Sequence, residues 1–265
     1  MGRRFRRIVS RFAPPTGHGF GFAAAPVLAL FLIFAVPTLA AAQKVDVELV
    51  LAVDGSGSID ENEFRLQRAG YAAAISHPDI LTTIASGAHR KIAVAFIEWG
   101  GEGSIHIIVD WMVISDASSA KAFASRLLAA PRRALGYNSI SGAILKATDM
   151  ILSNKYDATR KIIDISGDGP QIGGPPLVPA RAAALSQGIT INALVVAFRG
   201  GVIGGGGGVP LAEHYKREII GGRGAFVMMA DNKRRFTVSI LQKLVREIAG
   251  LSRNPAARRV GLPRG

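Results

Sequence analysis

The stretch VELVLAVDGSGSIDENEF, residues 47–64, decides the fold, because an apolar run ends abruptly in small polar residues. The run lacks the alternation of a half-exposed strand, so it predicts a strand over residues 45–53 that is buried on both faces. Asp60 and the glutamate three residues later have the spacing of a capping box, which predicts a helix over residues 60–76. In the loop between strand and helix, residues 54–58, two glycines separate three oxygen-bearing side chains. Such a loop is typical of a binding site.

The rest of the sequence repeats this alternation of strands and helices. The segment GGEG, residues 100–103, separates two β-branched runs and predicts a hairpin. Further strands are expected over residues 91–99, 104–113, 161–166, 190–197 and 225–229, and further helices over residues 116–130, 140–153, 179–187, 211–220 and 233–250. Continuous apolar strands between amphipathic helices predict a three-layer, doubly wound α/β fold. Its sheet is mostly parallel, with one antiparallel edge strand and helices on both faces.

Three regions are expected along the chain. Residues 1–42 contain five arginines, no acidic residue and an apolar run, and they end in small residues that suit a signal peptidase. This pattern predicts a cleaved signal peptide. The alternative is an uncleaved membrane anchor, since the apolar part approaches the length of a membrane span. Residues 43–250 form the predicted domain, and residues 251–265 a basic flexible tail. The protein is therefore expected to be exported, periplasmic or secreted, and membrane-anchored if the segment is not cleaved.

Charge and cysteine content narrow the classes of function. The net charge of +13 falls to +8 without the five arginines of residues 1–42. An exported protein rarely meets nucleic acid, so the basic excess favours an acidic protein partner, weak contact with an anionic membrane surface, or a plain solubilising surface. The chain has no cysteine, which excludes disulfides, thiolate zinc sites and cysteine nucleophiles.

Polar side chains gather in three predicted loops on one rim of the sheet, where the carboxyl ends of parallel strands meet. They are Asp54, Ser56 and Ser58 in the first loop, Asn138 and Ser139 before the helix at residue 140, and Asp168 after the strand at residues 161–166. Hydroxyl, amide and carboxylate oxygens are ligands for hard cations. The set predicts a site for Mg²⁺ or another hard divalent cation such as Mn²⁺.

These loops resemble the metal-ion-dependent adhesion site of von Willebrand factor type A domains. The segments AVDGSGSI (52–59), SISGAI (139–144), RKIIDISGDGP (160–170) and IGGRGAFV (220–227) together resemble a bacterial family of exported proteins of unknown function that is built on this domain. The resemblance covers residues 45–250. It implies an exported, metal-ion-dependent binding module of the adhesion type rather than an enzyme.

The resemblance also implies roles for the loop residues. Ser56 and Ser58 would bind the metal through their hydroxyls, and Asp54 and Asp168 would act mostly through water. An acidic side chain of a protein partner would complete the coordination. The sequence departs from the pattern of the type A superfamily at Asn138, where that superfamily usually has threonine, and the adjacent Ser139 is an alternative ligand.

Other interpretations of the same residues remain. A metal-dependent hydrolase is one, although Ser56 stands where a D-x-D nucleophile loop has its second aspartate. A structural domain with a degenerate metal site is another, and the glycines and Ser58 would then serve only a tight turn and a helix cap. The mid-strand Asp164 is expected to hydrogen-bond the site loops or to pair with Arg160 or another basic residue.

Overall fold

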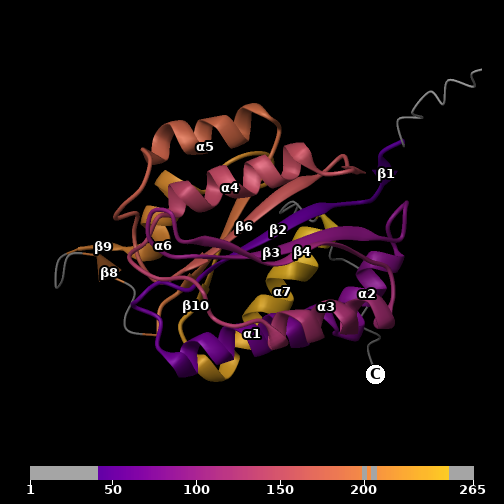
Figure 1. Ribbon diagram of the computed structural model, residues 1–265, viewed down its shortest axis with the longest axis horizontal. Helices are drawn as coiled ribbons and strands as arrows, with labels where there is room; N and C mark the ends of the chain where they lie inside the picture. Colours follow the sequence, from indigo (N-terminus) through magenta and orange to yellow (C-terminus); the bar gives the residue numbers. More distant parts are fainter. Residues whose placement is uncertain (1–40, 199–201, 204–207, 251–265) are drawn as a thin grey trace, which may run out of the picture. The chain divides into compact units, whose positions relative to one another are not determined.

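The computed structural model describes residues 41–198, 202–203 and 208–250 (Figure 1). The predicted signal segment lies outside the described residues except for its last two, and the predicted tail at residues 251–265 lies wholly outside them. In the described part of the chain, no helix is both long enough and apolar enough to span a membrane.

The strands are β1 Gln43–Lys44, β2 Glu48–Asp54, β3 Ile92–Trp99, β4 Ile105–Ile114, β5 Tyr156–Asp157, β6 Lys161–Gly167, β7 Thr190–Val196, β8 Val202–Ile203, β9 Val209–Pro210 and β10 Val227–Ala230. The α-helices are α1 Glu61–Ile75, α2 Pro78–Ala85, α3 Ala117–Ala129, α4 Ile140–Ser153, α5 Leu177–Ser186, α6 Leu211–His214 and α7 Phe236–Ala249. A π-helical turn, Tyr215–Ile219, follows α6, and a 3₁₀ turn, Lys233–Arg235, precedes α7.

The main sheet has six strands in the order β10-β7-β6-β2-β3-β4, and it confirms the predicted fold class. All neighbours are parallel except β3 and β4, which form the expected antiparallel pair at one edge. Strand β2 lies in the middle, between β3 and β6, and all seven of its residues are buried. Helices cover both of its faces, which explains why its sequence is apolar without alternation.

Two apolar cores lie on the two faces of the sheet. Leu49 and Leu51 of β2 belong to the core that α1, α2, α3 and α7 cover, together with Tyr71 and Phe123. Val50 and Ala52 of β2 belong to the core under α4, α5 and the π-helical turn. Figure 1 shows these two helical layers on opposite sides of the sheet.

Local sequence explains where α1 begins. Asp60 accepts a hydrogen bond from the Glu63 amide at 2.8 Å, and Glu63 accepts from the Asp60 amide at 3.3 Å, so the predicted capping box begins α1. Helix α4 has the predicted bounds. Helix α2 was not expected, because its eight residues contain several β-branched side chains and too few turns to show a clear period.

One buried ion pair joins the α1 layer to the sheet. Arg68 of α1 donates to both carboxylate oxygens of Glu98 in β3, at 2.7 and 3.0 Å, and both side chains are almost fully buried. The same guanidinium donates to the carbonyls of Leu127 and Pro131, at 3.0 and 3.1 Å, and to that of Ala130. It therefore fixes the end of α3, where the chain turns toward the rim of the sheet.

We predict that Arg68→Met destabilises the domain by about 3–5 kcal/mol, because Glu98 would then be a buried carboxylate without its cation. The matched control is Arg65→Met on the same helix. Arg65 pairs with Glu61 at 2.9 Å, but both side chains are more than half exposed, so the control is expected to change stability by less than about 1 kcal/mol. Urea unfolding followed by circular dichroism measures both. Equal midpoints for the two variants would contradict the prediction.

Candidate metal centre

The sheet register brings two of the predicted loops together. Strands β2 and β6 are parallel neighbours, and Val53 lies opposite Ser166. Asp54, the last residue of β2, therefore ends beside the end of β6, and the chain leaves β6 into Asp168 one residue later. The third loop enters α4, and this helix packs on the same two strands.

Asp54 is the most deeply buried acidic group of these loops, with 1% of its surface exposed. Its Oδ1 accepts from the Ser56 amide at 2.8 Å. Its Oδ2 is buried and has no hydrogen bond of acceptable geometry among the described residues. The backbone amide of Asp168 nevertheless lies near enough to lower the pKa of Asp54 slightly. Burial and the nearby Asp168 carboxylate raise the pKa of Asp54 to about 7, against the opposing effect of the Ser56 hydrogen bonds.

A chain of side-chain contacts links the other oxygen atoms. Ser56 Oγ donates to Asn138 Oδ1 at 2.9 Å and lies 3.1 Å from Ser58 Oγ. Ser58 Oγ donates to Asp168 Oδ1 at 2.9 Å. Five of the six residues singled out in the sequence thus come together at one place on the rim, and all three loops contribute.

Ser139, the sixth residue, is placed differently. Its amide donates to the carbonyl of Gly100 at 2.8 Å, which fixes the start of α4. Its hydroxyl is buried without a hydrogen-bond partner in the described chain, and it faces Gly174, where an added Cβ would lie 2.1 Å from the oxygen. Gly174 also has a φ of +87°, so a side chain there would be both strained and blocked.

Gln171 is a residue of these loops that the sequence did not single out. Its side-chain oxygen accepts from the Ser141 amide at 2.9 Å, and its nitrogen donates to Ser141 Oγ at 2.7 Å. It ties the loop after β6 to the first turn of α4, and the backbone amides of Ile172 and Gly173 reinforce the tie by donating to the carbonyl of Asn138. A glutamine in a Pro- and Gly-rich loop carries no pattern that predicts this contact.

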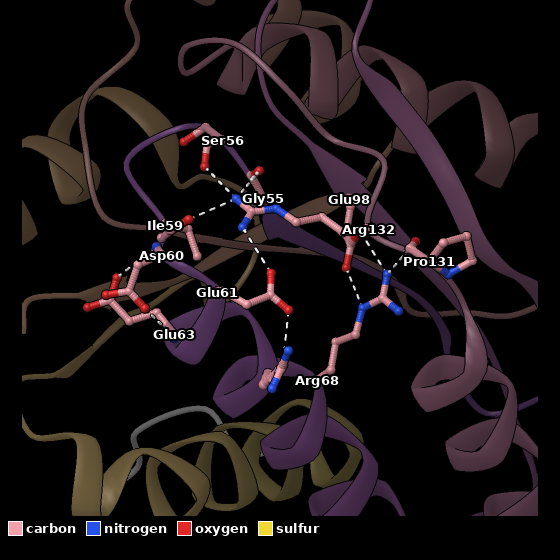
Figure 2. A network of polar contacts seen from close by, with 11 residues as sticks. Gly55, Ser56, Ile59, Asp60, Glu61, Glu63, Arg68, Glu98, Pro131 and Arg132 are labelled. Atoms are coloured by element: carbon pink, nitrogen blue, oxygen red, sulfur yellow. Dashed lines mark hydrogen bonds and ion pairs between the residues drawn. The ribbon is translucent and has the colours of Figure 1, made fainter.

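Arg132 holds the first loop from outside. Its Nη2 donates to the carbonyls of Gly55, Ser56 and Ile59, at 3.1, 3.0 and 2.8 Å. Figure 2 shows the guanidinium inserted between these carbonyls and the carboxylate of Glu61, which lies 3.8 Å from Nη1. The carbonyl oxygens are thereby turned toward Arg132, and the hydroxyls of the loop are left for the rim.

The chemistry of this cluster suits a hard divalent cation. It offers two hydroxyls, an amide oxygen and two carboxylates within one hydrogen-bonded chain, and these are the ligand types of Mg²⁺ and Mn²⁺. The buried Asp54 Oδ2 has no hydrogen bond of acceptable geometry among the described residues. Among the described residues no group of three or more His, Cys, Asp or Glu side chains could hold a metal, so this centre would depend on hydroxyl and amide ligands.

Comparisons with known sequences assign residues 44–252 to a single family, described as "Protein of unknown function (DUF1194)". A search of curated proteins found no match.

Solved structures show the fold. The pilus adhesin SpaC from Lactobacillus rhamnosus GG is 15% identical with a TM-score of 0.57, over 79% of this chain and 31% of the adhesin. Proximal thread matrix protein 1 from the mussel byssus, with a zinc-occupied MIDAS motif, is 12% identical with a TM-score of 0.59, over 78% and 49%. The vWF domain of the pili tip protein Mfa5 from Porphyromonas gingivalis is 11% identical with a TM-score of 0.52, over 83% and 98%. The domain thus has the von Willebrand factor type A fold, and the chain spans about a third of the adhesin's length.

We predict that Arg132→Met loosens the first loop without unfolding the domain, because three carbonyls lose a charged donor. Such hydrogen bonds contribute about 1.5–3 kcal/mol each, so amide protection at residues 55–59 should fall at least about tenfold. Hydrogen exchange read by mass spectrometry measures this. The neighbouring Arg133 is exposed, so Arg133→Met is the control and should leave protection unchanged. Unchanged protection in both variants would show that Arg132 does not hold the loop.

Proposed function

The chain belongs to the DUF1194 family, whose function is unknown. We propose that it is an exported, non-enzymatic binding module. It captures a protein partner through a divalent cation, Mg²⁺ or Mn²⁺, held on the loop rim. Residues 43–250 would form the binding domain. Residues 1–42 would be the export signal and residues 251–265 a basic tail, and both lie largely outside the described residues.

The observation that carries the proposal is the linked set of oxygen atoms from Asp54, Ser56, Ser58, Asn138 and Asp168. Burial, and after it repulsion from the Asp168 carboxylate, raises the pKa of Asp54, and a cation between the two carboxylates would offset both effects. When bound, a divalent cation supplies the positive charge that an acidic side chain of a partner would recognise. The neutral hydroxyl and amide ligands would leave much of that charge available.

Apolar side chains beside these loops support a protein as the partner. Tyr137 and Leu135, just before Asn138 in the sequence, are 72% and 71% exposed, and Ile172, in the loop after Asp168, is 63% exposed. The backbone amide of Ile172 donates to the Asn138 carbonyl at 2.9 Å, so this apolar group lies next to the polar one. Exposed aromatic and aliphatic side chains around a polar centre are typical of protein interfaces. The fitting partner carries an acidic residue flanked by apolar residues.

We predict that the protein binds one Mg²⁺ or Mn²⁺ in calorimetric titration and that Asp54→Asn does not. At a metal concentration about 100-fold above Kd, binding should stabilise the wild type by about 2.7 kcal/mol and the variant not at all. Without metal the variant should be at least as stable as the wild type, because it no longer buries a carboxylate. Asp60→Asn, which keeps an N-cap, is the control and should bind metal normally.

The same proteins test the binding function in a display experiment. Random peptides are selected on the wild type in Mg²⁺, and the enriched sequences are expected to carry Asp or Glu next to a large apolar residue. EDTA should release them, and Asp54→Asn should not retain them. Tyr137→Ser should weaken peptide binding while leaving the metal titration unchanged. Peptides that are retained equally in EDTA, or that lack an acidic residue, would refute a metal-mediated capture.

A further prediction concerns Asn138. Its carbonyl oxygen stands one bond further out than the hydroxyl of a threonine, the residue that the resemblance to von Willebrand factor type A domains would place here, and Mg²⁺ demands near-octahedral geometry with ligands at about 2.1 Å. We expect weak Mg²⁺ affinity in the wild type and tighter binding in Asn138→Thr, both measured by calorimetry. Ser139→Ala is the matched control, because the hydroxyl of Ser139 faces Gly174, and it should leave affinity unchanged. The opposite pattern would make Ser139 the ligand of the third loop.

A further inference from the structure

A second polar cluster lies inside the core, away from the loop rim. We call it the lysine cluster: Lys243 and Glu247 on α7, Asp164 on β6 and Asn192 on β7. All four side chains are at most 2% exposed. Lys243 and Glu247 are one helical turn apart, and Asp164 lies directly opposite Asn192 in the sheet. Asp164 thus pairs with a basic residue other than Arg160, whose guanidinium instead donates to the carbonyls of Glu247 and Ile248 near the end of α7.

The lysine is in contact with both carboxyl groups. Lys243 Nζ lies 2.5 Å from Asp164 Oδ1 and 2.5 Å from Glu247 Oε1. Glu247 Oε1 also accepts from Asn192 Nδ2 at 2.9 Å, which fixes the glutamate on one side of the amine. Asp164 is held to the amine by the ion pair, and neither of its oxygens has a further hydrogen-bond partner among the described residues.

Burial makes the charged form of this cluster costly. Two carboxylates and one ammonium leave one negative charge uncompensated in the core, and desolvation raises the pKa of both carboxyls, that of Glu247 to about 7. Burial therefore favours the protonated form of the two carboxyl groups, and a neutral product would remove the remaining buried charges.

The Lys243 amine and the Asp164 carboxyl group are thus in direct contact in the core. We propose that Lys243 and Asp164 become joined by an intramolecular amide bond, with Glu247 as the catalytic acid and base. In water such a bond is unfavourable, because two well-solvated ions are lost to form it. In the core both groups are already desolvated, so this opposing term is removed, and the product replaces a buried ion pair by a neutral amide.

The reaction balances without a further reagent. The Lys243 ammonium first transfers a proton to the Asp164 carboxylate. The Nζ lone pair then attacks Cγ of Asp164 to form the C–N bond, while Glu247 donates its proton to the Asp164 carbonyl oxygen. Glu247 next takes the proton that Nζ loses and passes it to one of the two hydroxyls on Cγ. That C–O bond breaks, one water molecule leaves, and the proton of the other hydroxyl returns to Glu247 as the amide carbonyl forms. Nothing is oxidised or reduced, and Glu247 ends in the protonation state in which it began.

The structure favours Asp164 over Glu247 as the acid that is consumed. Asp164 has a short side chain on β6, which lies between β2 and β7 and cannot retreat from the amine. Glu247 is oriented by Asn192 and keeps a second oxygen, Oε2, that is buried without a partner in the described chain and is available for proton transfer. The Phe226 ring, 5.6 Å from Lys243 Nζ, adds an apolar wall beside the amine.

Peptide mapping of the purified full chain tests the proposal. Trypsin releases residues 162–181 and 236–243 as separate peptides from an unlinked chain. The amide bond blocks cleavage at Lys243, so the expected product joins residues 162–181 to residues 236–246 and has the summed mass of these two segments less one water. Tandem mass spectrometry locates the bond. Recovery of the two separate peptides in full from the folded wild type would overturn the proposal.

Two variants separate the roles. Lys243→Met should give no joined product, and Glu247→Gln, which keeps the size of the side chain but cannot relay the proton, should give at least tenfold less. Lys146→Met, at a partly exposed lysine outside the cluster, is the control and should link like the wild type. Full linkage in Glu247→Gln would refute the role of Glu247. A link from Lys243 to Glu247, seen as a product without residues 162–181, would refute the choice of Asp164. Circular dichroism verifies that each variant is folded.

Discussion

The burial of Asp54 at the end of a strand that is covered on both faces is the constraint on which the rim depends. A carboxylate there loses its hydration, and the chain must compensate locally. It does so by turning sharply, so that the Ser56 amide reaches Oδ1. The turn is possible because Gly55 can approach Ala134, where an added Cβ would lie 2.9 Å from the neighbouring Cβ. Arg132 then holds the carbonyls of the turn on its outer side. The hydroxyls of Ser56 and Ser58 project toward the other two loops as a result, and the compensation of a single buried charge organises the whole candidate centre.

Ligand chemistry explains why the centre would serve binding better than hydrolysis. A site built from several carboxylates neutralises its cation and holds it firmly, whereas hydroxyl and amide oxygens leave much of its charge uncompensated. Here only Asp54 and Asp168 carry charge, and Asp54 is buried at the strand end while Asp168 is half-exposed. Tyr137 and Ile172 are exposed beside the cluster. Their apolar surface would favour the docking of a protein partner.

Local signals in the sequence were sufficient to predict four features. Continuous apolar residues predict the central strand, and an Asp and a Glu at cap spacing predict the start of α1. A Gly-rich turn predicts the antiparallel edge, and a clear helical period predicts the bounds of α4. The convergence of Asp54 and Asp168 also followed, since parallel strands end on one edge. Helix α2 was missed, although Pro78 at its first position was a usable signal. The support that Arg132 and Gln171 give to the loops, and the position of the Ser139 hydroxyl, depend on contacts between segments far apart in the chain. No local pattern encodes those contacts.

Strand β6 connects the two polar regions of the domain. Its residues alternate, so Asp164 and Ser166 lie opposite Leu51 and Val53 of β2 and share their face toward α1 and α7. The strand then ends, and Asp168 emerges on the rim. A strand that carries a carboxylate in the core and another just beyond its end must be positioned accurately, since a slip of one residue would bury Asp164 in the apolar core beneath α4 and remove it from Lys243. The ion pair with Lys243 therefore helps to set the register of β6 in the sheet, in addition to compensating the charge of Asp164. By fixing β6 against α7 in the core, the lysine cluster also fixes the point at which Asp168 leaves the sheet, and so the distance between the two carboxylates that a cation would have to bridge.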